Sequence, residues 1–158
     1  MNLRFLDPEK DLPLYEEAWC WQFEKPRWWR ELFDIWQEKK EEFLKNRFRE
    51  TRADIGVFDD REKFVALISL DAAAAGIFEA HFECRRGTSP ELLTDAIISA
   101  KEHVLGNGAR EIFIFVAAPN RPLLKICENC GFERTNIRIL YGEFRGAPVA
   151  WEQLRVRN

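Results

Sequence analysis

Gly76 to Gly108 decides the fold and reads Gly-Ile-Phe-Glu-Ala-His-Phe-Glu-Cys-Arg-Arg-Gly-Thr-Ser-Pro-Glu-Leu-Leu-Thr-Asp-Ala-Ile-Ile-Ser-Ala-Lys-Glu-His-Val-Leu-Gly-Asn-Gly. Its first part alternates apolar and polar residues, and successive side chains of a strand point to opposite faces. The alternation therefore predicts a strand over Ile77–Cys84. One face would carry Phe78, Ala80, Phe82 and Cys84, and the other Glu79, His81, Glu83 and Arg85.

A helix is predicted directly after this strand, from Pro90 to Leu105. Thr88 or Ser89 can cap its N-terminus, and proline suits the first turn. Its apolar residues recur at helical spacing and define one face: Leu92, Leu93, Ala96, Ile97, Ala100 and Val104. The loop Arg85–Ser89 places backbone N–H groups and two arginines at the positive end of this helix. The arrangement predicts a site for an anionic group such as phosphate.

Composition narrows the classes of protein that fit. The chain has 158 residues, of which 46% are apolar and 32% charged, with a formal net charge of −3. We expect one domain over residues 1–158, because this length is enough to bury a core. The net charge gives no sign of nucleic-acid binding. No apolar run approaches the roughly 20 residues that span a bilayer, and the N-terminus lacks an apolar leader, which favours a cytoplasmic setting.

The four cysteines raise the question of metal or redox chemistry. In the cytoplasm we expect them to be thiols rather than disulfides. Cys127 and Cys130 form a Cys-x-x-Cys pair, but a zinc site needs about four ligands and no second ligand pair is present. A redox pair is typical of a helix start, whereas this pair lies at a predicted helix end. We therefore predict no metal site.

The rest of the chain shows the same kinds of signal. Further strands are predicted over Asn2–Leu6, Ala53–Phe58, Lys63–Leu70, Glu111–Ala117, Thr135–Phe144 and Val149–Val156. Further helices are predicted over Leu12–Glu24, Arg27–Arg49 and Asn120–Gly131. Asp71–Gly76 is predicted to be a connection of small residues. The continuous apolar run Ile-Phe-Ile-Phe-Val within Glu111–Ala117 predicts a strand buried on both faces.

The resulting order is β-α-α-β-β-β-α-β-α-β-β. The sequence therefore predicts an α+β fold with a mixed, largely antiparallel sheet flanked by helices.

This order and two motifs resemble the GNAT superfamily of N-acetyltransferases along nearly the whole chain. The family loop Gln/Arg-x-x-Gly-x-Gly/Ala aligns with Cys84–Ser89. The segment Asn120–Phe132 looks like the family pattern Asn-x-x-Ala-x-x-x-Tyr-x-x-x-Gly-Phe, with Asn120, Gly131 and Phe132 at the family spacing. The chain departs from the pattern at several positions: Cys84, Ser89, Pro90 and Cys127.

The resemblance implies transfer of an acetyl or other acyl group from coenzyme A to a small-molecule or peptide amine. It assigns acetyl-CoA or coenzyme A to a set of residues around the loop: Phe82, Cys84, Arg85, Arg86, Gly87, Thr88, Ser89 and Asn120. The pantetheine arm would run between the strands Ile77–Cys84 and Glu111–Ala117. A catalytically inactive binding or scaffold module of the same fold is the alternative, because the loop is degenerate. A homodimer is possible.

Candidate catalytic groups come from the polar face of the central strand. Glu79 or His81 could take the proton of the acceptor amine, or this face could simply be solvated. Cys127 could protonate the leaving thiolate, or it could be a small core residue; Tyr141 is an alternative acid. Most of the rings between Trp19 and Trp36 are expected in the core, but Trp28 or Trp29 could contact the acceptor.

Overall fold

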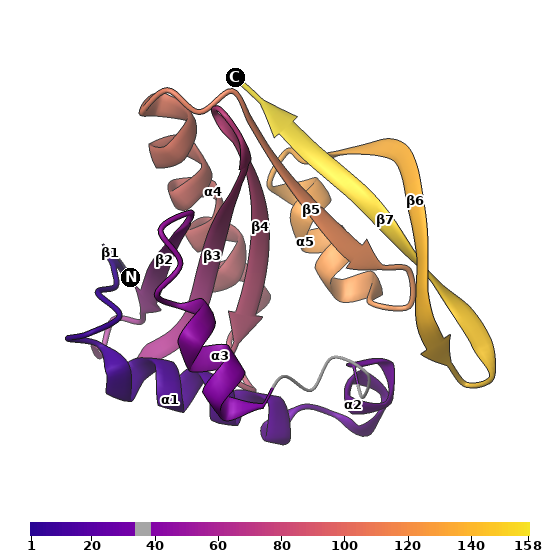
Figure 1. Cartoon of the computed structure of the whole chain (residues 1–158), viewed down its shortest axis with the longest axis horizontal. Coiled ribbons are helices and arrows are strands. Elements are labelled where there is room, and N and C mark those ends of the chain that lie inside the picture. Colours follow the sequence, from indigo (N-terminus) through magenta and orange to yellow (C-terminus); the bar gives the residue numbers. More distant parts are fainter. Residues whose placement is uncertain (34–38) are drawn as a thin grey trace.

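The computed structural model describes residues 1–33 and 39–158 (Figure 1). Across these residues one seven-stranded sheet has the order β1-β2-β3-β4-β5-β7-β6. Its strands are β1 (Asn2–Phe5), β2 (Arg52–Phe58), β3 (Phe64–Ala74), β4 (Ile77–Cys84), β5 (Glu111–Ala117), β6 (Glu133–Phe144) and β7 (Ala147–Arg157). The helices are α1 (Leu12–Cys20), α2 (Arg27–Phe33), α3 (Lys40–Asn46), α4 (Pro90–Gly106) and α5 (Arg121–Asn129), with a 3₁₀ helix at Trp21–Glu24.

The sheet is antiparallel except where β4 meets β5. These two strands pair in parallel over three residue pairs, from Ile77 opposite Glu111 to Glu79 opposite Phe113. Beyond that point they separate, and Figure 1 shows them diverging toward their C-terminal ends. The predicted α+β fold with a mixed, largely antiparallel sheet is therefore confirmed.

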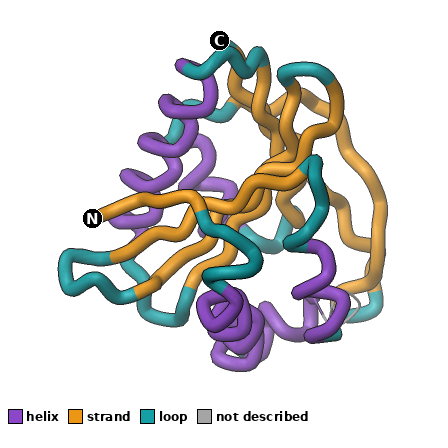
Figure 2. The backbone as a smooth tube through the Cα atoms, turned by 60° about the vertical axis from the view of Figure 1, so that its left-hand side comes forward, coloured by secondary structure: helices purple, strands orange, loops and turns teal. Residues whose placement is uncertain are grey.

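Helices cover the sheet on both faces (Figure 2). On one face, α4 and α5 pack over the larger core, which includes Ile68, Ala80, Ile97, Ile112, Leu124 and Leu154. On the other face, α1, the 3₁₀ helix and α3 pack over a second core of Leu6, Tyr15, Ala18, Trp21, Phe43, Phe64 and Leu67. The adjacent β3 residues Leu67 and Ile68 belong to different cores, because alternate side chains of a strand face opposite sides.

The decisive strand–loop–helix segment forms as predicted. Phe78, Phe82 and Cys84 pack toward the core that contains Ala80. Of the two possible caps, Ser89 is used: its Oγ accepts from the Leu92 N–H at 3.1 Å. The helical face is also confirmed, since its central residues Ala96, Ile97 and Ala100 are buried.

Strand β3 continues to Ala74, so the predicted end at Leu70 and the loop Asp71–Gly76 are wrong. Asp71 pairs with Glu79 and Ala72 with Phe78, and a bulge lies between Ala72 and Ala74. Alanine has low strand propensity, which made the run resemble a connection. Pairing with β4 overrides that preference and leaves a short turn at Gly76, whose φ is +72°.

Strand β5 is not buried on both faces, contrary to the prediction. Ile112, Ile114 and Val116 are buried, whereas Phe113 and Phe115 between them are half-buried. The reason is the separation of β4 from β5, which leaves one face of β5 incompletely covered. The half-buried phenylalanines therefore mark the face on which the sheet opens.

The N-terminal helices are shorter than predicted. α1 ends at Cys20, and the 3₁₀ helix completes the predicted span to Glu24. The single helix predicted over Arg27–Arg49 is wrong in extent, since α2 ends at Phe33 and α3 runs over Lys40–Asn46. Residues 34–38, with the predicted helical positions of Ile35 and Trp36, lie outside the described residues.

The C-terminal hairpin is longer than predicted. β6 begins at Glu133 rather than Thr135, and β7 runs from Ala147 to Arg157. Between them the turn contains Arg145, with φ +52°, and Gly146, with φ +79°.

Candidate functional site

The loop between β4 and α4 is fixed to β3. The Arg85 N–H donates to the Val65 carbonyl at 2.9 Å, and the Thr88 hydroxyl lies 3.1 Å from the same oxygen. Gly87 adopts φ +85°, a conformation that favours glycine. A Cβ added there would meet no atom within 4 Å. The loop backbone is therefore ordered and open on its outer side.

Three backbone donors of this loop are available to a ligand. Among the described residues, the N–H groups of Arg86, Gly87 and Ser89 have no hydrogen-bond acceptor. The Thr88 N–H already donates to the Arg85 carbonyl at 3.2 Å, so its predicted place in the donor set is weakened. The 17-residue helix α4 adds its positive end to these donors.

The two arginines of the loop differ in their surroundings. Arg85 is half-buried, and its Nη1 donates to Glu17 Oε1 of α1 at 2.9 Å. Arg86 is exposed and makes no ion pair within the described part of the chain. Arg86 is therefore the arginine better placed to meet an anion, and Arg85 connects the loop to α1.

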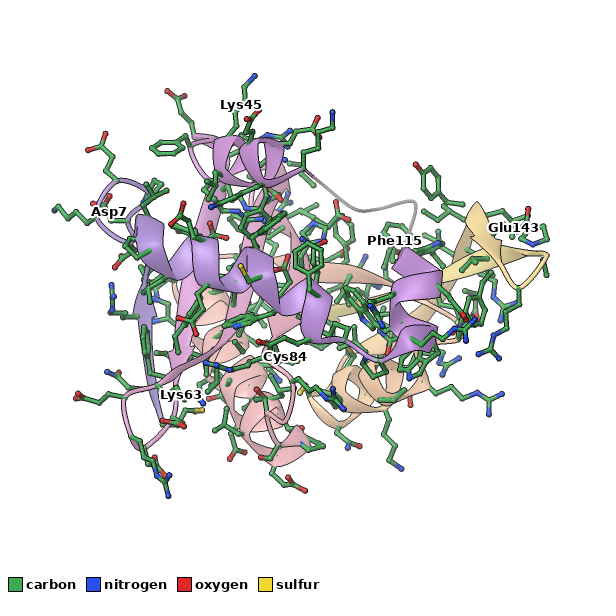
Figure 3. All side chains as sticks on the ribbon, turned by 90° about the horizontal axis from the view of Figure 1, so that it is seen from below. Asp7, Lys45, Lys63, Cys84, Phe115 and Glu143 are labelled. Carbon is green, nitrogen blue, oxygen red and sulfur yellow. The ribbon has the colours of Figure 1, made fainter. Side chains whose placement is uncertain are left out.

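Strands β4 and β5 are paired as far as Glu79 and Phe113. Beyond these residues their facing edges are not joined by strand pairing. Figure 3 shows Cys84, the last residue of β4, below the N-terminal helices, and Phe115 of β5 beside α2. Lys25 reaches this region: its Nζ donates to the Cys84 carbonyl and lies 3.5 Å from Cys84 Sγ. The sequence gives no signal for this contact, because 59 residues separate the partners.

The polar side chains of β4 lie beside charged side chains of β2 and β3. Together, Arg52, Asp71, Glu79 and His81 are called the polar grid below. In the sheet register, Glu79 is opposite Asp71 and His81 is opposite Ser69. His81 Nε2 lies 3.7 Å from Asp71 Oδ2 and 3.9 Å from Glu79 Oε1. Arg52 Nη1 contacts the same Asp71 oxygen at 3.3 Å. The structure thus brings both candidate bases together and adds Asp71 and Arg52.

The pKa of His81 is lowered from its ordinary value. Partial burial is the main cause, Arg52 and Arg47 act in the same direction, and the carboxylates of Glu79 and Asp71 oppose it. Glu79 and Asp71 by themselves favour the charged form, and burial outweighs them. About 47% of the side chain remains accessible, so water screens part of the effect. A neutral imidazole at pH 7 is the form a general base requires.

Glu83 continues this polar face toward the loop. Burial raises its pKa, while the charges of Arg47, Arg52 and Lys25 oppose the rise. A carboxyl group with a raised pKa beside a cleft is a further candidate for proton transfer. Sequence alternation placed Glu83 on this face, but its burial depends on the helices packed above it.

A buried ion cluster lies beside the polar grid, in the same row across the sheet as His81. Arg47 Nη1 lies 3.2 Å from Asp54 Oδ1 and 3.0 Å from Ser69 Oγ. Arg52 Nε contacts the same Asp54 oxygen at 3.3 Å. The side chains of Arg47 and Asp54 are 3% and 2% exposed. Ser69, in turn, lies opposite His81 in the sheet.

Asn120 is the N-cap of α5, and Cys127 lies on α5, on the opposite face of the sheet from Glu79 and His81. Asn120 is buried and caps the helix by accepting from the Leu123 N–H at 3.4 Å. Cys127 is 0% exposed and belongs to the larger core, and burial raises its pKa to about 12. These positions show a structural role for each, and their predicted functional roles stay predictions.

Trp28 on α2 and Tyr141 on β6 lie on the side of the molecule where β4 and β5 separate. Trp28 packs against a small core of Ala117, Val149 and Trp151. It also lines a cavity of about 660 Å³ with Arg27, Glu31 and Arg145, between α2 and the β6–β7 turn. Tyr141 is half exposed on β6, and its carbonyl accepts from Trp151 Nε1 at 3.0 Å.

Trp29 makes its contact with Lys25 near the end of β4 rather than with the lining of this cavity. The Lys25 ammonium is 5.5 Å from the centre of its ring, within the range of a cation–π interaction. Trp29 and Lys25 therefore form one group beside Cys84, while Trp28 belongs to the cavity.

The described residues contain no group of three or more His, Cys, Asp or Glu side chains arranged to hold a metal ion. None of their helices is long and apolar enough to cross a membrane.

Comparison with known proteins gives matches to solved structures. No family model matches the sequence, and no curated protein matches it. A chimeric spermidine N-acetyltransferase from Vibrio cholerae has a TM-score of 0.73 at 16% identity, covering 99% of this chain and 96% of that one. A structure described as a phosphinothricin N-acetyltransferase has a TM-score of 0.73 at 17% identity, covering 99% and 97%.

A structure described as that of a "probable acetyltransferase" from Staphylococcus epidermidis ATCC 12228 is similar over the same extent, with a TM-score of 0.75 at 15% identity, covering 99% and 98%. At these identities the similarity bears on the fold. The chain therefore has the fold of the GNAT superfamily of N-acetyltransferases.

Proposed function

We propose that this protein transfers an acetyl group, or a related acyl group, from coenzyme A to an amine. The observation that carries the proposal is the loop Arg85–Ser89, which presents three unused N–H donors at the end of β4, where β4 has left β5. Arg86 is exposed, and Gly87 has free space on its outer side. These two residues complete a surface that fits the phosphates of coenzyme A.

Coenzyme A, when bound, supplies an activated acyl thioester. The loop residues Arg86, Gly87 and Ser89 bind its phosphates through backbone N–H groups, and Arg86 adds charge. The unpaired edge of β4 lies between this loop and the polar grid. A ligand along that edge passes from the phosphate site to the side chains of Glu79 and His81.

His81 is the proposed general base, with Glu79 as the second candidate. Neutral imidazole accepts the proton of the acceptor ammonium, and Asp71 and Glu79 stabilise the resulting imidazolium at 3.7 and 3.9 Å. The same carboxylates attract a cationic amine before reaction. Ser69 lies beside His81 on the neighbouring strand, and the buried Arg47–Asp54 pair holds Ser69 in place.

Cys127 is an unfavourable source of the proton that the leaving thiolate needs. Its pKa of about 12 exceeds the roughly 8.5 of an ordinary thiol. Transfer from Cys127 to a thiolate of that pKa would be uphill by about 5 kcal/mol. We therefore favour Tyr141 or water as the acid, and Cys127 as a core residue.

The cavity beside Trp28 is the proposed acceptor side. The Trp28 ring offers a face that an acceptor could contact. Glu31 already pairs with Arg27 at 2.8 Å and with Arg145 at 3.6 Å, so a cationic acceptor would have to compete with these two arginines for its carboxylate. Spermidine is the first acceptor to test, since a spermidine N-acetyltransferase is among the similar structures. The four free thiols of the described structure fit the proposed cytoplasmic setting.

Two measurements test the proposal. Calorimetric titration with acetyl-CoA should show binding in the wild type and none in Gly87→Glu, which puts a negative side chain into the open side of the loop. Gly108→Glu is the matched control, because Gly108 also has positive φ and open space but lies at the opposite end of α4. Retained affinity in folded Gly87→Glu would refute the cofactor placement.

Release of the coenzyme A thiol should then be followed with a panel of amines that includes spermidine. Amine-dependent release supports transferase activity. Binding without turnover on any amine would support the alternative, a GNAT-fold module that only binds acyl-CoA. The absence of binding would favour a scaffold.

A further inference from the structure

The C-terminal end of β4 has backbone groups that face away from β3. The Arg85 N–H donates to the Val65 carbonyl, so these two residues form a hydrogen-bonded pair of the antiparallel ladder. Such pairs alternate with pairs whose N–H and C=O groups point outward from the two strands. Cys84 and Ala66 are the neighbouring pair in the register. The Cys84 carbonyl therefore points away from β3, toward the side on which β4 and β5 separate.

Lys25 reaches this edge of β4 from the segment between the 3₁₀ helix and α2. Its ammonium donates to the Cys84 carbonyl and also lies 3.5 Å from Cys84 Sγ. The Cys84 side chain packs toward the larger core, on the face of the sheet opposite the N-terminal helices. Because the ammonium contacts both the carbonyl and the sulfur, it lies at the edge of the strand rather than over one face of the sheet.

The positive charge of Lys25 has no carboxylate partner among the described residues. Lys25 is half-buried, and its other contact is with the ring of Trp29. The Glu83 carboxyl is close enough to feel this charge, but burial raises the pKa of Glu83 and no ion pair joins the two groups. Arg85, by contrast, is paired with Glu17 at 2.9 Å. Lys25 is therefore a partly buried cation that an anion could compensate.

Unused backbone donors continue from this end of β4 into the loop. Cys84 is followed directly by the loop whose Arg86, Gly87 and Ser89 N–H groups have no acceptor among the described residues. In the GNAT loop pattern the place of Cys84 is taken by Gln or Arg, so this chain lacks a long polar side chain there. Lys25 brings an ammonium to the same end of the strand from a distant part of the chain.

We propose that Lys25 is a further coenzyme A-binding residue, whose ammonium contacts the diphosphate of the cofactor at the end of β4. The inference rests on the proposed function, because it requires coenzyme A at the loop Arg85–Ser89. An ammonium has three donors, and the Cys84 carbonyl occupies one of them. The remaining donors can form charge-assisted hydrogen bonds to phosphate oxygens, beside the N–H groups of the loop.

Calorimetric titration with acetyl-CoA tests this role in Lys25→Met, which keeps a long apolar side chain and removes the charge. Affinity should fall by about tenfold or more at low salt, since charge-assisted hydrogen bonds are among the stronger ones. The difference from the wild type should shrink below about twofold in about 1 M NaCl, because salt screens an ionic contact. Lys101→Met is the matched control and should leave affinity unchanged. Lys101 also donates to a backbone carbonyl, that of Cys130 at 2.7 Å, but lies in the second half of α4.

Covalent labelling of the wild type gives a second readout that needs no variant. The protein is treated with an amine-reactive ester, and the modified lysines are quantified by peptide mass spectrometry. Bound coenzyme A should slow the labelling of Lys25, because the phosphates cover its ammonium, and should leave the labelling of Lys101 unchanged.

The outcomes separate this inference from the proposed function. Unchanged affinity in Lys25→Met, or equal labelling of Lys25 with and without coenzyme A, would overturn the inference and leave the cofactor placement standing. A loss of affinity that persists at high salt would also overturn it, because Lys25 would then only support the edge of β4. A wild type that binds no acetyl-CoA would overturn both the inference and the proposed cofactor.

Discussion

Removal of the Asp54 carboxylate should cost more stability than any single change to the polar grid. Asp54 is 2% exposed and accepts from Arg47 at 3.2 Å and from Arg52 at 3.3 Å through one oxygen. In Asp54→Ala the Arg47 guanidinium stays buried without a carboxylate partner. Breaking a buried pair in this way costs roughly 3–5 kcal/mol. A domain of ordinary stability, about 5–15 kcal/mol, would lose a large fraction of its total.

Comparison with the polar grid makes the expectation sharper. Asp71 is 22% exposed and shares Arg52, so water can replace part of its role. Asp71→Ala should therefore cost no more than about 2 kcal/mol. Lys10→Gln, which removes an exposed pair with Asp7, should cost less than about 1 kcal/mol.

Urea unfolding followed by tryptophan fluorescence measures these differences. Asp54→Leu combined with Arg47→Met should lose less than the two single changes together, because no unpaired charge then remains. A loss below about 1 kcal/mol in Asp54→Ala, or strict additivity in the double variant, would refute the view that the cluster is a buried, coupled unit.

Two further predictions concern the chemistry of the site. Because the pKa of His81 is lowered, kcat/KM should rise with pH through a midpoint below that of an ordinary histidine; Arg52→Met, which removes a positive neighbour, should move the midpoint upward, and an unchanged profile in His81→Gln would contradict the assignment. With a maleimide, exposed Cys20 and half-buried Cys84 should react before buried Cys127. Bound acetyl-CoA should slow the labelling of Cys84 only. Peptide mass spectrometry that shows Cys127 labelled as fast as Cys20 would contradict its burial.

Local patterns predicted the central strand and its helix well. The alternation over Ile77–Cys84 and the cap at Ser89 need only neighbours along the chain, and both appear in the structure. The extension of β3 to Ala74 could not be predicted in this way, because alanines enter a strand there only through pairing with β4. The partial exposure of Phe115 likewise depends on the separation of β4 from β5, which no local pattern in the sequence indicates.

The candidate site was predictable only in part, for a related reason. Glu79 and His81 share a face through simple alternation, but their partners come from other strands. Asp71 was assigned to a loop, and Lys25 reaches Cys84 across 59 residues. Tertiary structure also sets the direction of the His81 pKa, through burial first and then through the charges of Arg52 and Arg47.

The short contact between β4 and β5 has a consequence for how the molecule unfolds. β1 to β4 form one antiparallel meander, and β5, β7 and β6 form a second antiparallel unit. Within the sheet, three parallel residue pairs join the two units. The shared packing of α4 and α5 on one face joins them as well. Amide hydrogen exchange should therefore resolve two cooperative blocks with separate opening free energies, and their boundary should fall between Glu79 and Phe113.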